Sequence, residues 1–111
     1  MESPHFKLNI NGDRFFYFEF FGKQGDLLLM SGEYKSKADA LQSIKDVQVG
    51  SLMSPQIAAG KTPDGGNFFV IKGQQGDILA KSVLFDSEMV FNNALHQVKD
   101  SACIAKTLDA T

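Results

Sequence analysis

The fold of this chain is decided by a thirty-five-residue stretch that occurs twice. Residues 13–47 read DRFFYFEFFGKQGDLLLMSGEYKSKADALQSIKDV, and residues 64–98 read DGGNFFVIKGQQGDILAKSVLFDSEMVFNNALHQV. The two copies align without a gap at a constant offset of 51 residues. Because similar sequences fold alike, the duplication predicts two equivalent units packed about a pseudo-twofold axis.

Identical residues at that offset mark the positions that define the unit. They are Phe18 and Phe69, Gly22 and Gly73, Leu28 and Leu79, Ser31 and Ser82, Ser36 and Ser87, Val47 and Val98, and the turns Gln24-Gly25-Asp26 and Gln75-Gly76-Asp77.

Three short strands open the first copy. Residues 6–10 alternate apolar and polar side chains, which is typical of a half-buried strand. An Asn-Gly turn follows, in which we expect the glycine to supply the positive φ of a tight hairpin. Residues 14–21 and 26–31 form the next two strands, and the Gln-Gly between them resembles the Asn-Gly of two-residue hairpin loops. These links predict antiparallel pairing.

A helix completes each copy. Ser36 and Ser87 are the predicted N-caps, and Gly50 is a natural stop for the first helix. Apolar residues at i, i+4 and i+7 give each helix one buried stripe. The stripes are Ala40, Ile44 and Val47 in the first helix, and Phe91, Leu95 and Val98 in the second.

The second copy supplies strands over residues 57–61, 68–72 and 78–81, and residues 102–106 are predicted to form a short C-terminal strand. The chain is therefore predicted to be a single α+β domain, residues 1–111, made of two tandem strand–strand–strand–helix repeats. The repeats cover about residues 5–50 and about residues 56–107. With two helices for about six strands, we expect both helices on one face of a mainly antiparallel sheet.

Composition narrows the class of protein. The chain has 111 residues, 43% of them hydrophobic, which favours one globular domain. Its net charge of −2 lacks the positive excess of nucleic-acid binders. Its one cysteine, Cys103, excludes an internal disulfide. The first residues lack a secretory-signal pattern and no apolar run approaches the ~20 residues of a membrane span, so we expect a cytoplasmic protein without membrane contact.

The motifs together resemble the YegP-like family, small bacterial proteins built from one or two copies of this unit. The resemblance rests on the strand FYFEF at 16–20, the turn at 24–26, Ser31-x-x-Tyr34 and the helix that follows, and on their counterparts in the second copy. It covers about residues 6–109. It implies two units that share one sheet and exchange terminal strands, with one-copy relatives forming homodimers. It implies no catalytic residue and no cofactor.

This chain departs from the family pattern at two motifs. Gln-Gly stands in both turns where the family usually has Asn-Gly, and Phe85 stands where the family has tyrosine. The second copy thus lacks a hydroxyl group at a motif position. That loss weakens a catalytic interpretation of this position.

The repeated motif positions have a functional and a structural interpretation. Asp26 and Asp77 are candidate acceptors of a ligand-recognition loop, but both turns must close a hairpin whatever the function. A nucleophile at Ser31 or Ser82 needs an activating base and an oxyanion hole. The structural interpretation is therefore favoured for Gln24, Gly25, Asp26, Ser31, Tyr34, Gln75, Gly76, Asp77, Ser82 and Phe85.

Metal and cofactor sites are not predicted. His5, His96 and Cys103 show no ligand spacing, and His96 falls one step beyond the buried stripe of its helix. The glycine pair at 65–66 does not lead into a helix, as a phosphate-cradling loop would. We expect Cys103 to act as a small hydrophobic residue.

One face of the second strand is the candidate interface. Phe15, Tyr17 and Phe21 fall on the side of the strand that the helices are not expected to cover. An exposed aromatic patch of this kind marks an interface or a ligand platform, unless a loop or the tail covers it. If the patch is an interface, a homodimer is the simplest assembly that would use it.

The sequence thus favours a non-catalytic binding or protein-interaction module, with a second copy or another protein as partner. The alternative is a small-ligand-binding protein or weak enzyme with a cleft between the two repeats. Nucleic-acid binding through stacked aromatics is the least favoured class. The cations Lys7, Arg14 and Lys23 are balanced there by Asp13, Glu19 and Asp26.

Overall fold

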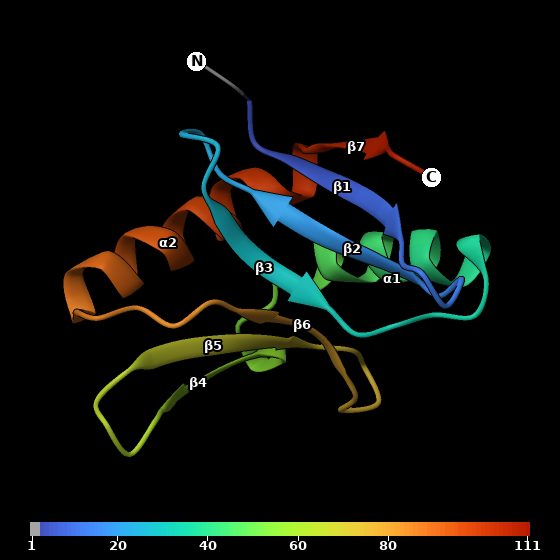
Figure 1. The fold of residues 1–111 in the computed structure, drawn as a ribbon. Coiled ribbons are helices and arrows are strands. Elements are labelled where there is room, and N and C mark those ends of the chain that lie inside the picture. The colour runs from blue at the N-terminus through green and yellow to red at the C-terminus, as the bar shows by residue number, and fades with distance from the viewer. Residues whose placement is uncertain (1–2) are drawn as a thin grey trace.

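The computed structural model describes residues 3–111 and has an α+β fold, with one seven-stranded sheet and two long helices (Figure 1). The predicted α+β class is confirmed. The strands are β1 (His5–Ile10), β2 (Phe16–Phe21), β3 (Leu27–Ser31), β4 (Ile57–Lys61), β5 (Asn67–Lys72), β6 (Ile78–Ser82) and β7 (Lys106–Asp109). The helices are α1 (Lys37–Gly50) and α2 (Glu88–Ser101), followed by the short 3-10 helices Ser54–Gln56 and Ala102–Ile104.

The sheet is mixed and has the strand order β4-β5-β6-β3-β2-β1-β7. β7 runs parallel to β1, and the other five neighbouring pairs are antiparallel. The prediction of a final strand over residues 102–106 is wrong in its position. Residues 102–104 instead form a 3-10 turn, closed by a bond from the Ala105 N–H to the Ala102 carbonyl (3.3 Å), so the chain extends only from Lys106.

The outer strands of the two halves pair in the same register. Phe6 lies opposite Phe20 in β1–β2, and Ile57 lies opposite Ile71 in β4–β5, which is the same pair displaced by 51 residues. The halves join where β3 and β6 run antiparallel, with Met30 opposite Lys81.

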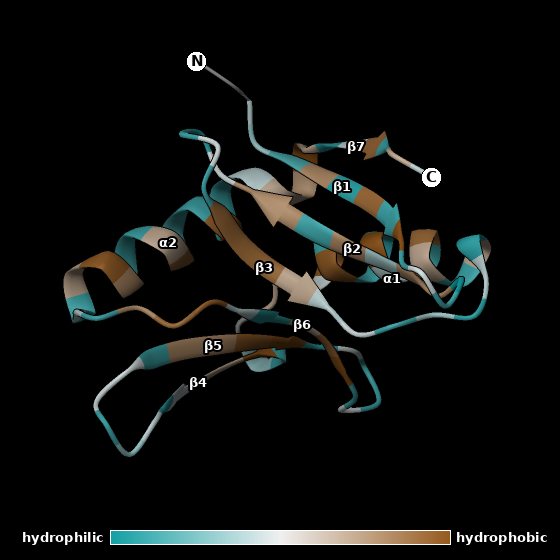
Figure 2. Ribbon diagram, in the orientation of Figure 1, coloured by the Kyte–Doolittle hydropathy of each residue, from teal (hydrophilic) through white to brown (hydrophobic). Residues whose placement is uncertain are grey.

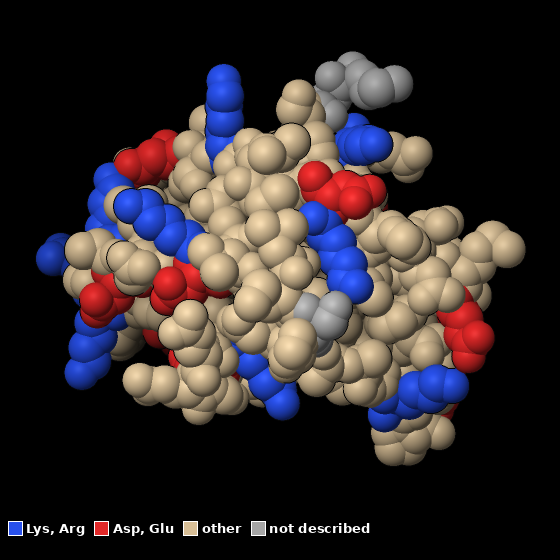
Figure 3. All heavy atoms as spheres, turned by 180° about the vertical axis from the view of Figure 1, so that it is seen from behind, with Lys and Arg blue, Asp and Glu red and all other residues tan. Residues whose placement is uncertain are grey.

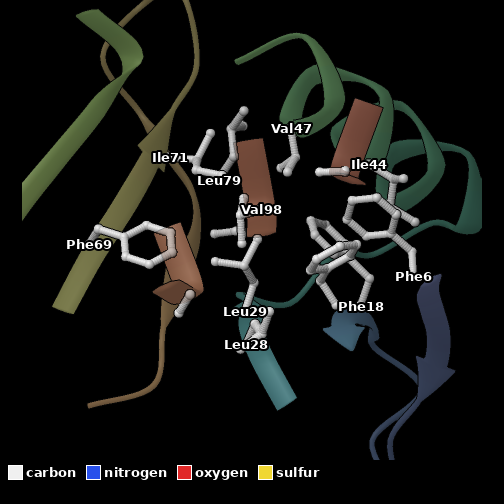
Figure 4. Close-up of a cluster of buried hydrophobic side chains, with 14 of the residues drawn as sticks. Phe6, Phe18, Leu28, Leu29, Ile44, Val47, Phe69, Ile71, Leu79 and Val98 are labelled. Carbon is white, nitrogen blue, oxygen red and sulfur yellow. The ribbon is translucent and has the colours of Figure 1, made fainter. Parts of the chain in front are cut away.

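A single core lies between the sheet and the helices, which Figure 1 shows together behind the sheet. Phe6, Phe18, Phe20 and Phe69 are fully buried in it, and Figure 4 shows Val47 and Val98 pointing into the same cluster. Figure 2 shows the alternation of apolar and polar residues along β1 that places one face in this core.

The buried stripe of α1 is the predicted one, because Ala40, Ile44 and Val47 are all buried. The stripe predicted for α2 is shifted. Its buried residues are Ala94, Val98 and Ser101, whereas Phe91 and Leu95 are half-buried. The Phe91 ring packs edge-on against Phe69 (5.8 Å between centroids), near the β4 end of the sheet, where fewer side chains surround it.

The four hairpin turns share one hydrogen-bond pattern, which corrects two predictions. In each, a three-residue loop ends in a residue of positive φ, the usual type I turn with a bulge. The glycine of Asn11-Gly12 was expected to supply the positive φ, but Arg14 has it instead, and the Gln-Gly loops contain three residues rather than two. The four positive-φ residues are Arg14 (67°), Gly25 (79°), Gly65 (92°) and Gly76 (87°).

Candidate functional site

The face of the sheet opposite the helices is a continuous surface to which all seven strands contribute. Because residues in register share a face, the strand pairs define a row across the sheet. We call this surface the open face. Its row is Leu108, Lys7, Glu19, Met30, Lys81, Val70 and Ala58, and it is flanked by His5, Asn9, Tyr17, Phe21, Phe68 and Lys106.

Two of the three predicted interface residues lie on the open face. Tyr17 is opposite Asn9 and Phe21 is opposite His5, and both aromatic side chains are half-buried. Phe15 is also half-buried, but it lies in the turn before β2, where its N–H donates to Asn11 Oδ1 (3.0 Å). Whether these residues form an interface stays a prediction.

Polar neighbours occupy the faces of the aromatic rings on this surface. The His5 ring stacks on Phe21, with centroids 5.4 Å apart and planes inclined by 22°. Lys81 Nζ lies 4.7 Å from the centroid of the Phe68 ring, a cation–π contact. These contacts leave the open face amphipathic rather than purely apolar.

Charge on the open face differs from that of the whole molecule. Lys7, Lys81 and Lys106 lie on it, and Glu19 is the one acidic residue among those that the register places there. Glu19 is already engaged by Asn9, whose Nδ2 donates to Oε1 (3.0 Å). The face is therefore cationic in a protein of net charge −2, while both signs are interspersed on the helix side (Figure 3).

Sequence reasoning found the β2 part of this surface but did not predict which strands continue it. Lys81 and Phe68 come from the second copy and Lys106 from the C-terminal strand. Period-2 alternation places Phe68 on a face, but only the β3–β6 and β1–β7 pairings bring these residues beside Tyr17 and Phe21.

The repeated serines have a structural role in both copies. The Phe18 N–H donates to Ser31 Oγ (2.8 Å), and the Phe69 N–H donates to Ser82 Oγ (2.9 Å). Each hydroxyl then donates to a carbonyl one residue further on, at Gly32 (2.7 Å) and Val83 (2.9 Å). Each serine thus replaces a missing strand partner, and neither hydroxyl contacts a histidine.

Tyr34 and Phe85 also hold the strands together. Each pairs through its backbone with the first residue of a strand, Tyr34 with Phe16 and Phe85 with Asn67. The Tyr34 hydroxyl bonds Ser43 Oγ of α1 (2.5 Å). The residue that corresponds to Ser43 in the second copy is Ala94, so both hydroxyls of the pair are absent there.

The Gln-Gly-Asp turns close the β2–β3 and β5–β6 hairpins. The Gly22 N–H donates to the Asp26 carbonyl (2.9 Å), and the Gly73 N–H donates to the Asp77 carbonyl (2.7 Å). The side chains of both aspartates are exposed. Gln24 is exposed as well, and Gln75 lines a shallow groove.

A groove of about 920 Å³ lies at one end of the sheet. Its ionisable lining residues are His5, Lys23, Asp100 and Lys106. It joins the beginning of the first copy to the end of the second, and the β3–β6 junction does not line it. A ligand-binding cleft between the two repeats therefore stays a prediction, and this groove is where the ends of the two repeats lie together.

Two carboxyl groups have shifted pKa values. A hydrogen bond from Thr62 lowers the pKa of Asp64, and hydrogen bonds from Lys37 and Thr111 hold the pKa of Asp109 well below its usual range. Neither carboxyl lines the groove of about 920 Å³ or the groove beside Gln75.

Among residues 3–111, no three His, Cys, Asp or Glu side chains come together as a metal-binding group. His96 is exposed and Cys103 is partly exposed. Neither helix in the described chain is long and apolar enough to cross a membrane.

The fold and the paired motifs resemble those of the YegP-like family. A UPF0339 protein of Photorhabdus laumondii is 24% identical over 95 residues, covering 86% of this chain and 83% of that protein. A UPF0339 protein of Bordetella pertussis is 26% identical over 109 residues, covering 98% and 97% of the two chains. No family model matches the chain.

Two solution NMR structures share the fold. The UPF0339 protein SO3888 of Shewanella oneidensis superposes with a TM-score of 0.92 at 21% identity, covering 97% of this chain and 92% of that one. The protein of unknown function yegP from E. coli superposes with a TM-score of 0.91 at 22% identity, covering 100% and 96%. The resemblance to the YegP-like family is thereby confirmed.

Proposed function

We propose that this protein is a non-catalytic binding module whose open face binds an acidic segment of another protein. The single observation that carries the proposal is the makeup of that face. Lysines from three strands surround half-buried aromatic side chains, and the one acid in the row, Glu19, is already bonded to Asn9. Protein interfaces are enriched in aromatic residues, and a cationic surface steers and selects an acidic partner.

The ring contacts favour a protein partner over nucleic acid. Bases bind single-stranded sites by stacking on free aromatic faces. Here His5 covers Phe21 and Lys81 covers Phe68, so these faces are occupied by the protein's own side chains. A polypeptide needs apolar contact and charge pairing, and both remain accessible.

Charge also favours a different protein over a second copy. Two open faces stacked on each other would bring the lysines of one against the lysines of the other. Like charges in such a contact oppose association. A homodimer through this face is therefore the outcome that would overturn the choice of partner.

We also propose that the chain arose by duplication and keeps a pseudo-twofold axis between β3 and β6. In support, Leu29 lies opposite Ser82 and Ser31 lies opposite Ala80, two pairs that exchange under the offset of 51 residues. Met30 and Lys81, which correspond to each other, meet between them. In this proposal the single domain of residues 1–111 contains two repeats, and the open face extends from one repeat to the other across the β3–β6 pair.

The test is a titration followed by NMR spectroscopy, with poly-L-glutamate and a single-stranded thymidine 12-mer as probes. We expect poly-L-glutamate to shift open-face amides in β1, β2 and β6 and to lose affinity with salt, because exposed charge pairs are screened. The matched variants are Lys81→Glu on the open face and Lys45→Glu on the exposed side of α1. Only Lys81→Glu should weaken binding.

Three results would contradict the proposal. One is an equal response of both variants, and another is a set of shifts confined to the helix side. The third is a stronger open-face response to the oligonucleotide, which would assign the face to nucleic acid. Sedimentation velocity over a range of concentrations adds the test of a homodimer, whose appearance would replace the acidic partner by a second copy.

A further inference from the structure

The β7 strand shows how this fold binds an extended segment at a sheet edge. It lies parallel to β1, with Asp109 in register with Leu8. Beyond it, the Ala110 N–H donates to the Leu8 carbonyl (2.9 Å). The Asp109 side chain turns to the helix side and pairs with Lys37, the first residue of α1. Backbone pairing and one ion pair to a helix start therefore hold the segment.

The opposite edge of the sheet, at β4, has a similar strand arrangement but no strand that corresponds to β7 in the described chain. β4 is the last strand of the sheet, and within residues 3–111 no strand lies on its outer side. Its register with β5 matches the register of β1 with β2, displaced by 51 residues. An edge strand presents unpaired N–H and carbonyl groups, which are a template for another strand.

A groove of about 500 Å³ lies along this edge. Ala59 of β4 corresponds to Leu8 of β1, which is fully buried, whereas Ala59 is exposed. The smaller side chain leaves room above the half-buried ring of Phe91. The lining residues are Ala59, Gly60 and Lys61 of β4, Asn67 of β5, and Glu88, Phe91 and Asn92 of α2.

The charge at the helix start is reversed in this groove. Glu88, the first residue of α2, occupies the position that Lys37 occupies in α1. Its present partner is Lys61, at 3.6 Å, with 68% of the lysine and 77% of the glutamate side chain exposed. An ion pair as exposed as this contributes little, so Glu88 can exchange its partner at small cost.

We infer that the β4 edge binds an extended basic peptide as an eighth strand, parallel to β4. A lysine or arginine in register with Ala59 faces the helix side, as Asp109 does beside Leu8. Its aliphatic stem packs over Phe91 and its charge pairs with Glu88. This site is separate from the open face and stands without the function proposed for that face.

The same charges disfavour the protein's own terminal strand as the occupant. The β7 strand of a second copy, docked in the equivalent register, brings Asp109 against Glu88. The repulsion of two carboxylates disfavours that exchange. The occupant is therefore a different polypeptide with a basic residue at this position.

The test uses two synthetic peptides of residues 105–111, one unchanged and one with Asp109→Arg, both with blocked ends. The full chain labelled with ¹⁵N is titrated with each peptide and followed by NMR spectroscopy. We expect the Asp109→Arg peptide to shift amides of β4 and the first turn of α2, and to bind about tenfold more tightly than the unchanged peptide.

A charge reversal in the protein makes the test specific. Glu88→Lys should invert the preference between the two peptides, and the exposed turn variant Asp26→Lys, which changes the net charge equally, should leave it unaltered. Amide spectra of both variants establish that they are folded. The inference is overturned if the Asp109→Arg peptide gives no shifts in β4 at millimolar concentration, or if Glu88→Lys and Asp26→Lys respond alike. Shifts along β1 would show displacement of β7 instead, which also overturns it.

Discussion

The two edges of the sheet contain strands that correspond in sequence, β1 and β4, but within residues 3–111 only β1 is covered by a further strand. In the described chain, β7 lies along β1, whereas β4 has no neighbour on its outer side. Leu8 fills the space beneath the covered edge, while Ala59 leaves a groove beneath the other. Lys37 meets an acid on the docked strand, and Glu88 faces solvent in its place. Two strand pairs with the same register therefore have different outer surfaces because of a few substitutions.

The interior of the two halves differs by compensated changes. The hydrogen-bonded pair Tyr34–Ser43 of the first half is replaced in the second half by Phe85 and Ala94, which need no polar partner. Losing both hydroxyls together avoids leaving one of them buried without a bond. The core thus remains equivalent where the surface does not.

The largest expected effect comes from the two central phenylalanines. Phe18→Ala and Phe69→Ala should each lower the free energy of unfolding by about 3–5 kcal/mol, because both side chains are fully buried. If the halves share one core, each variant unfolds in a single transition in chemical denaturation. Two separate transitions in either variant would divide the chain into independent units.

The strand-linking serines should differ between the halves. Ser82→Ala leaves the buried Phe69 N–H without an acceptor and should cost about 1–3 kcal/mol. Ser31→Ala should cost less, because Ser31 is partly exposed and water can bond the freed N–H. Denaturation midpoints of both variants provide the measurement, and a larger loss for Ser31→Ala would contradict this ranking.

The Tyr34–Ser43 pair can be converted to the form of the second half. Tyr34→Phe and Ser43→Ala should each cost about 1 kcal/mol, and the double variant should cost less than the sum. A double-mutant cycle measures this coupling. Additive losses would mean that the hydroxyls do not depend on each other.

The turn at Arg14 should tolerate the residue of its counterpart. Arg14 holds the positive φ that Gly65 holds in the second half. Arg14→Gly should stabilise the protein by about 0.5–1 kcal/mol, and Gly65→Ala should destabilise it by about 1 kcal/mol, because positive φ is costly for a side chain. Thermal midpoints that move in the opposite directions would contradict this reading of the two turns.

The smallest effect concerns pH and the covered edge. The pKa of Asp109 is lowered in the folded protein by Lys37 and Thr111, so its contribution is present above the usual carboxyl pKa of 3.8. That contribution is lost as pH falls through the lowered pKa. Asp109→Asn should remove this part of the acid dependence of β7 amide shifts, whereas Asp100→Asn, in an exposed position, should not.

The sequence predicted most strands, both helix starts and the buried stripe of α1 because their signals are local. Strand alternation, the Ser36 and Ser87 caps and the Ala40–Ile44–Val47 stripe each depend on neighbouring residues. What it did not predict depends on long-range pairing. The composition of the open face depends on the pairing of β3 with β6. The unpaired edge at β4 could be predicted only by knowing that β7 pairs with β1. The positive φ of Arg14 has no local signal, because arginine is not typical of that conformation.

Amide hydrogen exchange measures the difference between the two edges most directly. A strand with neighbours on both sides bonds every N–H, whereas an edge strand bonds alternate ones. We predict protection of successive amides along β1 and of alternate amides along β4, and a change of β1 to the alternate pattern when residues 106–111 are removed. Protection of successive amides along β4 in the free protein would contradict the account, because it would mean that this edge is already paired.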